Sequence, residues 1–105
     1  MDSQRLLDRY TGLHERVGFI LESGEIVECK NISPDPENAF EVAPEETIRY
    51  ADDAVATWHT HPGGDNNLSA NDYEMFLAWP GFSHFIVGEN GVQEYIIADG
   101  DVLIA

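Results

Sequence analysis

The chain has 105 residues, 43% of them hydrophobic, which suits one small globular domain over residues 1–105 and argues against a disordered protein. Twenty acidic residues against five basic ones give a net charge of −15, so nucleic acid is a poor partner. No apolar run approaches membrane-spanning length and the first residues lack a signal-peptide pattern, so we expect neither a membrane partner nor a secretory route.

The acidic excess has two explanations. Adaptation to high salt would keep the protein soluble where charges are strongly screened. Alternatively, one acidic face would meet a basic partner. Acidic residues occur in most segments, which favours a general surface property and leaves a salt-loving source open.

Apolar periodicity and turn residues predict the elements of the first half of the chain. They are a helix over 3–11, a buried strand over 17–21, a tight turn at Ser23-Gly24, a strand over 26–30, a loop over 31–38, a short strand over 39–42 and a helix over 44–50. Leu6, Tyr10 and Leu13 fall at helical spacing and should form the apolar face of the first helix. Cys29, the only cysteine, should be a small buried hydrophobe.

The second half continues with a strand, one helix and three further strands. The expected ranges are a strand over 54–61, a glycine-rich loop over 63–67, a helix over 69–79 with Tyr73, Phe76 and Leu77 as its apolar stripe, and strands over 82–87, 92–98 and 102–104. Helices interleaved with hairpins indicate an α+β domain with a mostly antiparallel sheet and helices packed against it.

Two histidines stand at the end of the strand over 54–61. Residues i and i+2 of a strand point to the same face, so the side chains of His59 and His61 should leave one side of the sheet. Pro62 cannot continue a central strand, and the strand should therefore end just after the pair. A lone strand histidine is usually structural, but two on one face beside a glycine-rich loop favour metal ligation.

Ser69 and Asp72 follow that loop at the start of the next helix, and two interpretations of them are open. The pattern Ser-x-x-Asp is typical of a helix N-cap with an acidic residue three positions later. Asp72 would also be a third metal ligand beside the two imidazoles, which is the ligand count of a catalytic zinc with its fourth position open. The interpretations are compatible, because Ser69 can cap the helix and still present its hydroxyl.

The spacing His-x-His-Pro, six residues, Ser, two residues, Asp resembles the signature of the JAMM (MPN+) metalloproteases. The resemblance implies a single JAMM/MPN-like domain with a mixed, mostly antiparallel sheet flanked by helices, the three-layer arrangement of cytidine deaminases. It also implies one Zn²⁺ per chain, held by His59, His61 and Asp72, and a catalytic Ser69 that donates a hydrogen bond to the oxyanion of the reaction.

JAMM proteins carry a general base, a glutamate, at the start of an early strand, and Glu15 occupies that place in Glu15-Arg16-Val17-Gly18. By composition alone Glu15 would be a solvated linker residue, and the resemblance makes it the catalytic base instead. Val17 stands where many relatives carry Cys, a position that we expect to affect packing alone. Gly18 should permit a close backbone approach.

For three other polar residues we expect no role in the chemistry of the site. His14 should be a surface residue or a neighbour of the site, and His84 a core or edge histidine of a strand. Asp65 should be a solvated loop acid, with substrate contact as the alternative.

The order of motifs is similar to the amino-terminal domain of the phage tail assembly protein K family. The similarity is carried by Cys29, Asn31, Ile32, Ser33, Asp35, Pro36, Glu37, Asn38 and Phe40, followed by Trp-His-Thr-His-Pro-Gly-Gly. Members of that family often carry a second, NlpC/P60-type cysteine peptidase domain, which this sequence lacks. Three explanations are open: a split gene with a separately encoded NlpC/P60 partner, a trimmed chain, or a free-standing relative. As a phage protein, this chain would be located in the host cytoplasm or the virion tail.

The sequence therefore predicts a zinc metallopeptidase that hydrolyses an amide bond in a protein or peptide substrate, with phage tail assembly as the first interpretation. The alternative is a cytoplasmic JAMM peptidase of a bacterial or archaeal cell that releases ubiquitin-like or sulfur-carrier proteins, which makes a ubiquitin-fold protein the substrate. An alternative of another class is a catalytically inactive MPN scaffold that binds a partner protein.

Overall fold

A computed structural model describes residues 3–10 and 12–105. Its centre is a six-stranded sheet with the order β2-β1-β3-β4-β5-β6. The strands are β1 (Val17–Leu21), β2 (Ile26–Cys29), β3 (Ala54–Thr60), β4 (Ser83–Gly88), β5 (Gly91–Ala98) and β6 (Asp101–Ile104). Within the described chain, β3 and β4 form the one parallel pair and the other neighbours are antiparallel, so the predicted mixed, mostly antiparallel sheet is confirmed.

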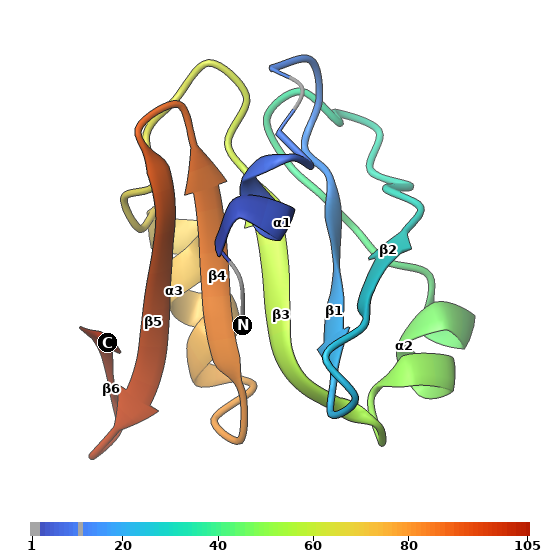
Figure 1. Ribbon diagram of the computed structural model, residues 1–105, viewed down its shortest axis with the longest axis vertical. Helices are drawn as coiled ribbons and strands as arrows, with labels where there is room; N and C mark the ends of the chain where they lie inside the picture. The colour runs from blue at the N-terminus through green and yellow to red at the C-terminus, as the bar shows by residue number, and fades with distance from the viewer. Residues whose placement is uncertain (1–2, 11) are drawn as a thin grey trace.

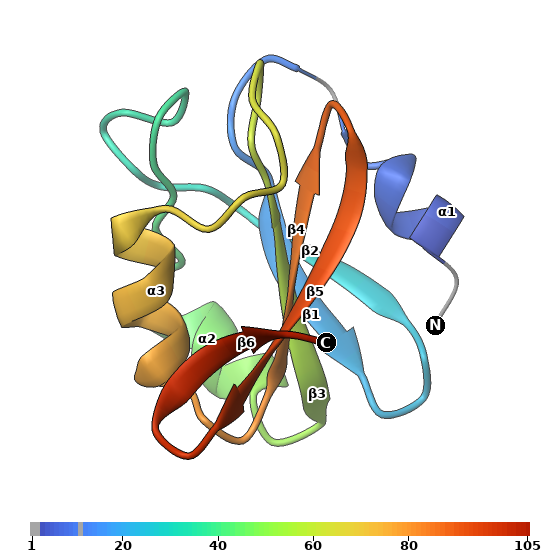
Figure 2. The same cartoon turned by 90° about the vertical axis from the view of Figure 1, so that its left-hand side faces the viewer.

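Helices cover both faces of the sheet (Figures 1 and 2). The first helix, α1 (Ser3–Leu7), lies on one face, while α2 (Pro44–Tyr50) and α3 (Ala70–Leu77) lie on the other. This is the expected three-layer α+β arrangement. No helix of the described residues is long and apolar enough to cross a membrane.

Side-chain alternation along the strands separates two apolar cores. On the α1 face the buried core residues are Leu6, Ile20, Ile26, Ala56, Trp58, Phe85 and Val87. On the α3 face they are Phe76, Ile86 and Tyr95. Because Trp58 belongs to the α1 face, the next residue, His59, points to the α3 face, where the candidate site lies.

The parallel pair β3 and β4 requires a crossover, and α3 supplies it. The chain leaves the end of β3 at the histidines, passes through the glycine-rich loop and returns along α3 to the start of β4. The crossover thus brings the first turn of α3 back to the end of β3.

Three local predictions differ from the structure. The first helix ends at Leu7 rather than at residue 11, and Leu13 is 70% exposed and so does not join its apolar face. Residues 39–42 form no strand, because the Asn31 side chain takes up part of their backbone: its Nδ2 donates to the Ala39 carbonyl and its Oδ1 accepts from Glu41 N–H. An Asn side chain has thus replaced a strand partner, which no local pattern announces. The third helix ends at Leu77, two residues early.

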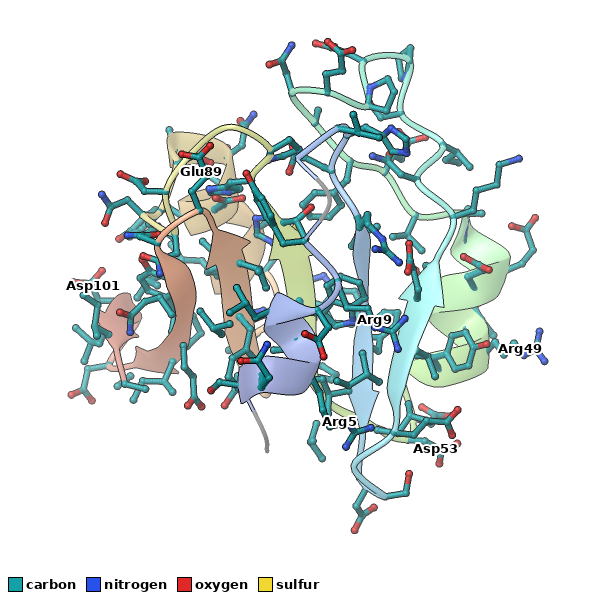
Figure 3. The ribbon with its side chains drawn as sticks, turned by 45° about the horizontal axis from the view of Figure 1, so that its top comes forward. Arg5, Arg9, Arg49, Asp53, Glu89 and Asp101 are labelled. Atoms are coloured by element: carbon teal, nitrogen blue, oxygen red, sulfur yellow. The ribbon has the colours of Figure 1, made fainter. Side chains whose placement is uncertain are left out.

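Exposed acidic side chains occur at separate parts of the surface (Figure 3). Asp53 precedes β3, Glu89 lies in the turn between β4 and β5, and Asp101 begins β6. This distribution supports the interpretation of the acidity as a general surface property.

Candidate metal centre

His59 and His61 converge at the end of β3, as strand alternation predicts. His59 is 1% exposed, and its Nε2 lies 3.1 Å from Nε2 of His61. Backbone pairing continues one residue past the strand, since His61 N–H donates to the Val87 carbonyl of β4 at 2.8 Å. Pro62 then turns the chain away from the sheet, and the two imidazoles are left facing the start of α3.

The His61 ring is oriented by the backbone of the loop that follows it. Its Nδ1 lies 2.8 Å from the carbonyl oxygen of Asp65. A carbonyl only accepts, so Nδ1 carries a hydrogen and donates it to Asp65, which leaves Nε2 as the nitrogen that faces Asp72 and that a metal would bind in place of a proton. The Asp65 side chain is exposed, as predicted, but the role of its carbonyl was not predicted, because backbone groups leave no mark on a residue pattern.

Asp72 lies in the first turn of α3 and faces both histidines. One carboxylate oxygen, Oδ1, is 3.0 Å from Nε2 of His59, and the other, Oδ2, is 3.0 Å from Nε2 of His61. Ser69 caps the same turn: its Oγ accepts from Asp72 N–H, and Oδ2 of Asp72 accepts from Ser69 N–H, both at 3.1 Å. The capping box is therefore confirmed, and it fixes the carboxylate that faces the histidines.

The donor atoms of His59, His61 and Asp72 fit a zinc ion. Nε2 of His59 and Nε2 of His61 lie 3.1 Å apart, and each lies 3.0 Å from a different carboxylate oxygen of Asp72. A tetrahedral zinc with bonds of about 2.0–2.1 Å would separate two donors by roughly 3.3 Å. Imidazole nitrogen and carboxylate oxygen are also the donors that zinc accepts in catalytic sites. The spacing and the chemistry of the three groups therefore agree.

The antiparallel register of β1 and β3 brings Glu15 to the same place. Val17 is paired with His59, and the pairing continues outward because Thr60 N–H donates to the Arg16 carbonyl at 2.9 Å. Glu15 consequently lies opposite His61. Candidate ligand atoms of Glu15, His59 and His61 lie within 4.8 Å of one another.

Glu15 is buried, with 7% of its surface exposed, so the interpretation as a solvated linker is wrong. Its backbone is held on both sides: Glu15 N–H donates to the Pro36 carbonyl at 2.7 Å, and Asn31 Nδ2 donates to the Glu15 carbonyl at 2.8 Å. The loop over 31–38 thus holds the backbone of Glu15 and leaves its carboxylate for the site.

Burial and the neighbouring charges shift the pKa values of the two carboxyl groups in opposite directions, and likewise those of the two histidines. Desolvation raises the pKa of Glu15 to about 7, and His61 partly opposes that rise. Desolvation also acts on Asp72, but hydrogen bonds from His59 and His61 outweigh it and hold the pKa of that carboxyl well below its usual range. Burial lowers the pKa of His59, whereas contacts with Asp72 and Asp65 outweigh burial at His61 and raise its pKa.

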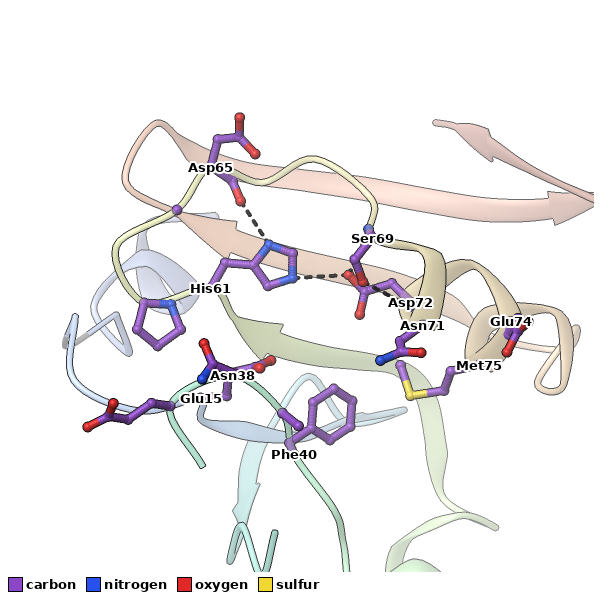
Figure 4. A pocket seen from close by; sticks show the side chains of 14 residues that line it. Glu15, Asn38, Phe40, His61, Asp65, Ser69, Asn71, Asp72, Glu74 and Met75 are labelled. Carbon is purple, nitrogen blue, oxygen red and sulfur yellow. Dashed lines mark hydrogen bonds and ion pairs between the residues drawn. The ribbon is translucent and has the colours of Figure 1, made fainter. Parts of the chain in front are cut away.

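An open cavity of about 700 Å³ is lined by Glu15, His61 and Asp72. Figure 4 shows His61, Asp72 and Ser69 on its wall, with the first turn of α3 beside the end of β3. Its lining also includes Glu37, Asn38, Phe40, Asp65, Asn71, Glu74 and Met75. A peptide chain in this cavity would meet Glu15, Ser69, His61 and Asp72 from one side.

Gly88 supports the loop of the site, although the sequence pattern did not single it out. A β-carbon at Gly88 would lie 2.4 Å from the backbone carbon of Asp65 and 2.5 Å from the nitrogen of Asn66. The loop also receives a hydrogen bond from the Tyr95 hydroxyl to the Asn66 carbonyl at 2.8 Å. A glycine at the end of a buried strand was the one available signal.

The other two histidines match their expectations. His14 is exposed. His84 is 1% exposed and belongs to the interior of the α3 face.

No protein-family model matches the chain, but the chain is similar to a known protein. A protein of Haloferax volcanii named Desampylase is 37% identical over 68 residues, which cover 58% of this chain and 48% of that protein. The aligned part thus spans about half the length of that relative.

Proposed function

We propose that this chain is a zinc-dependent hydrolase of the JAMM type that cleaves the amide bond between a ubiquitin-like modifier and a protein. The observation that carries the proposal is the convergence of two imidazole nitrogens and one carboxylate, 3.0–3.1 Å apart, beside the buried Glu15. A scaffold that only binds a partner has no need of such a set.

The three converging residues, His59, His61 and Asp72, would hold the zinc ion. When bound, zinc supplies a Lewis acid and activates a water molecule at neutral pH. Glu15 is in this proposal the proton carrier: its carboxylate takes a proton from water and gives it to the leaving nitrogen. Desolvation raises the pKa of Glu15 to about 7, a range in which a carboxyl group both accepts and releases protons at neutral pH.

Ser69 contributes a hydrogen-bond donor. Its Oγ accepts from Asp72 N–H in the helix cap, so the hydroxyl hydrogen stays available on the side that lines the cavity. In the proposal this hydroxyl donates to the substrate carbonyl oxygen as negative charge develops on it.

The likeness to a desampylase supports the removal of a conjugated modifier and thus favours the second sequence-based interpretation over phage tail assembly. Nothing in the comparison points to a tail protein or to an NlpC/P60 partner. The proposed substrate is therefore a protein that carries a ubiquitin-like modifier.

The test combines metal content with hydrolysis. After zinc loading and removal of free metal, the protein should hold about one zinc per chain and should cleave a ubiquitin-like protein from an isopeptide-linked conjugate. Glu15→Gln should keep the zinc while the rate falls at least about 100-fold, the lower range for a positioned acid–base group.

The matched control is His14→Gln, a change at the exposed neighbour of Glu15. It should keep both zinc and rate. Wild-type protein without zinc after loading, or Glu15→Gln with full activity, would overturn the proposal.

A further inference from the structure

His84 of β4 is a buried histidine that the proposed reaction does not use. It lies 1% exposed between the sheet and α3. Its Nε2 is 3.0 Å from the carbonyl oxygen of Trp79, and its Nδ1 is 2.6 Å from Oγ1 of Thr57. The carbonyl can only accept, so Nε2 carries the hydrogen, and Nδ1 accepts from the Thr57 hydroxyl. Burial lowers the pKa of His84, which agrees with this neutral form.

One partner of His84 lies on β3, and the other lies just after α3, the helix of Asp72. Thr57 stands two residues before His59 on the same face of β3. Trp79 follows the last turn of α3, and Asp72 stands in the first turn of that helix. The single imidazole therefore joins the strand of His59 to the helix of Asp72 by two hydrogen bonds.

A stack of rings completes the connection. The His84 ring lies on Phe76 of α3 with centroids 4.2 Å apart and planes within 9° of parallel. Phe76 also neighbours His59 and Tyr95, whose ring centroids each lie 6.0 Å away. Phe76 is itself fully buried, so a change in the His84 ring would reach His59 through direct packing.

The first turn of α3 is joined to the sheet at β6, where the Tyr73 hydroxyl donates to the Asp101 carboxylate at 2.8 Å, so its position over β3 needs a further connection. Its capping box is local to residues 69–72 and does not bind the helix to β3. Among the described residues, the polar contacts of Asp72 with β3 and the residue after it are those to His59 and His61, with which it would share a metal. Ligand sites need their groups held within roughly half an ångström, so a distal anchor has to set the position of the helix.

We propose that His84 is a positioning residue of the metal centre, which holds α3 on β3 so that Asp72 stands at bonding distance from a zinc ion on His59 and His61. The proposal rests on the metal set of the proposed function, but it does not depend on which bond is hydrolysed.

Two substitutions at His84 separate its hydrogen bonds from its ring. His84→Phe keeps a ring on Phe76 and loses both hydrogen bonds. His84→Gln loses the ring and places an amide nitrogen near the position of Nε2, where it can donate to the Trp79 carbonyl. Zinc affinity is measured by competition with a chelator, and Co²⁺ absorption reports the coordination geometry. Circular dichroism and the melting temperature of the metal-free protein report the fold.

His84→Phe should weaken zinc binding about 10–100-fold, the range for loss of a group that orients metal ligands, and should alter the Co²⁺ spectrum. His84→Gln should bind zinc with most of the wild-type affinity, because its amide can still donate to the Trp79 carbonyl. Thr57→Val removes the other hydrogen bond and keeps a side chain of similar shape. It should weaken zinc binding, but less than His84→Phe does. It replaces His84→Phe as the test if that variant does not fold.

The control is Ile20→Ala, which creates a cavity in the core of the opposite face. It should lower the melting temperature and leave zinc affinity unchanged. If His84→Phe behaves in the same way, His84 is merely structural and the inference fails. Zinc binding without hydrolysis in the wild type would overturn the proposed function alone, and a wild type that binds no zinc would overturn both.

Discussion

At the residue scale, the site depends on carboxyl groups placed in two different surroundings. Asp72 receives hydrogen bonds from two histidines and from a backbone N–H, which favour its charged form. Glu15 is buried, and no hydrogen bond to its carboxylate is recorded within the described chain, so its neutral form is favoured. One carboxyl group is thus suited to hold a cation and the other to exchange a proton.

The raised pKa of Glu15 predicts a pH dependence of the metal-free fold. Between the ordinary carboxyl pKa of 4.5 and about 7, the folded state keeps a proton that the unfolded state has released. Folding stability from this group is therefore present at low pH and lost as pH rises through that window. Glu15→Gln removes the effect and should raise the free energy of unfolding by about 1–3 kcal/mol at pH 8, but little at pH 4.5.

The measurement is urea unfolding of chelator-treated protein at the two pH values. Glu22→Gln, at an exposed position, serves as the control and should follow the wild type. Identical pH profiles of Glu15→Gln and wild type would contradict the expected burial of Glu15.

Asp72 and Ser69 share one capping box, but their substitutions should have different effects. Asp72→Asn removes the anionic ligand, so its main effect should be weaker zinc binding. Ser69→Ala should keep zinc, reduce the rate and cost about 1 kcal/mol of stability through loss of the cap. Zinc titration, single-turnover hydrolysis and urea unfolding of both variants check this. The Ser69 N–H that donates to the Asp72 carboxylate remains in Ser69→Ala, so zinc loss in that variant would show that the hydroxyl also positions Asp72.

At the scale of elements, the register of β1 on β3 decides where Glu15 lies. Gly18 pairs with Trp58 across these strands, and the Trp58 indole N–H passes over Gly18 to donate to the Val27 carbonyl of β2 at 3.1 Å. The predicted close approach at Gly18 is therefore confirmed. This contact joins β3 to β2 across β1 and thereby stabilises the register that places Val17 opposite His59.

Gly18→Ala should disturb this alignment. A β-carbon there would lie 1.9 Å from the Val27 carbonyl oxygen and 2.8 Å from Trp58 Nε1, so backbone must move. We expect a loss of at least about 2 kcal/mol in the free energy of unfolding and weaker zinc binding. Gly81→Ala, where an added β-carbon meets no atom within 4 Å, is the control and should be tolerated in both measurements.

At the scale of the whole molecule, 20 acidic and five basic residues share a chain of 105. Among the described residues, Arg9 and Arg16 form their ion pairs with the same carboxylate, Glu28. Most acidic side chains therefore face solvent and one another, and their repulsion opposes the compact state.

Screening of this repulsion predicts stabilisation by salt. The Debye length falls from about 10 Å at 0.1 M to about 3 Å at 1 M salt, so the melting temperature should rise by about 5 °C or more between 0.1 and 2 M KCl. A variant that combines Glu22→Gln, Asp53→Asn and Glu89→Gln should show a smaller rise. A melting temperature independent of KCl would contradict a fold that is limited by charge repulsion.

The sequence by itself determined the features that depend on neighbours along the chain. Strand alternation placed His59 and His61 on one face, Pro62 ended their strand, and the Ser69–Asp72 pattern began a helix. These follow from backbone geometry and local hydrogen bonds, which act over a few residues.

Tertiary structure decided the features that depend on pairing between distant segments. The approach of Glu15 to His61 comes from a strand register, and Asn31 replaces the strand predicted over 39–42. The carbonyl of Asp65 and the two hydrogen bonds of His84 likewise join segments that meet only in the fold. Residue patterns record side-chain type and spacing, whereas these contacts depend on which backbone atoms the folded chain brings together.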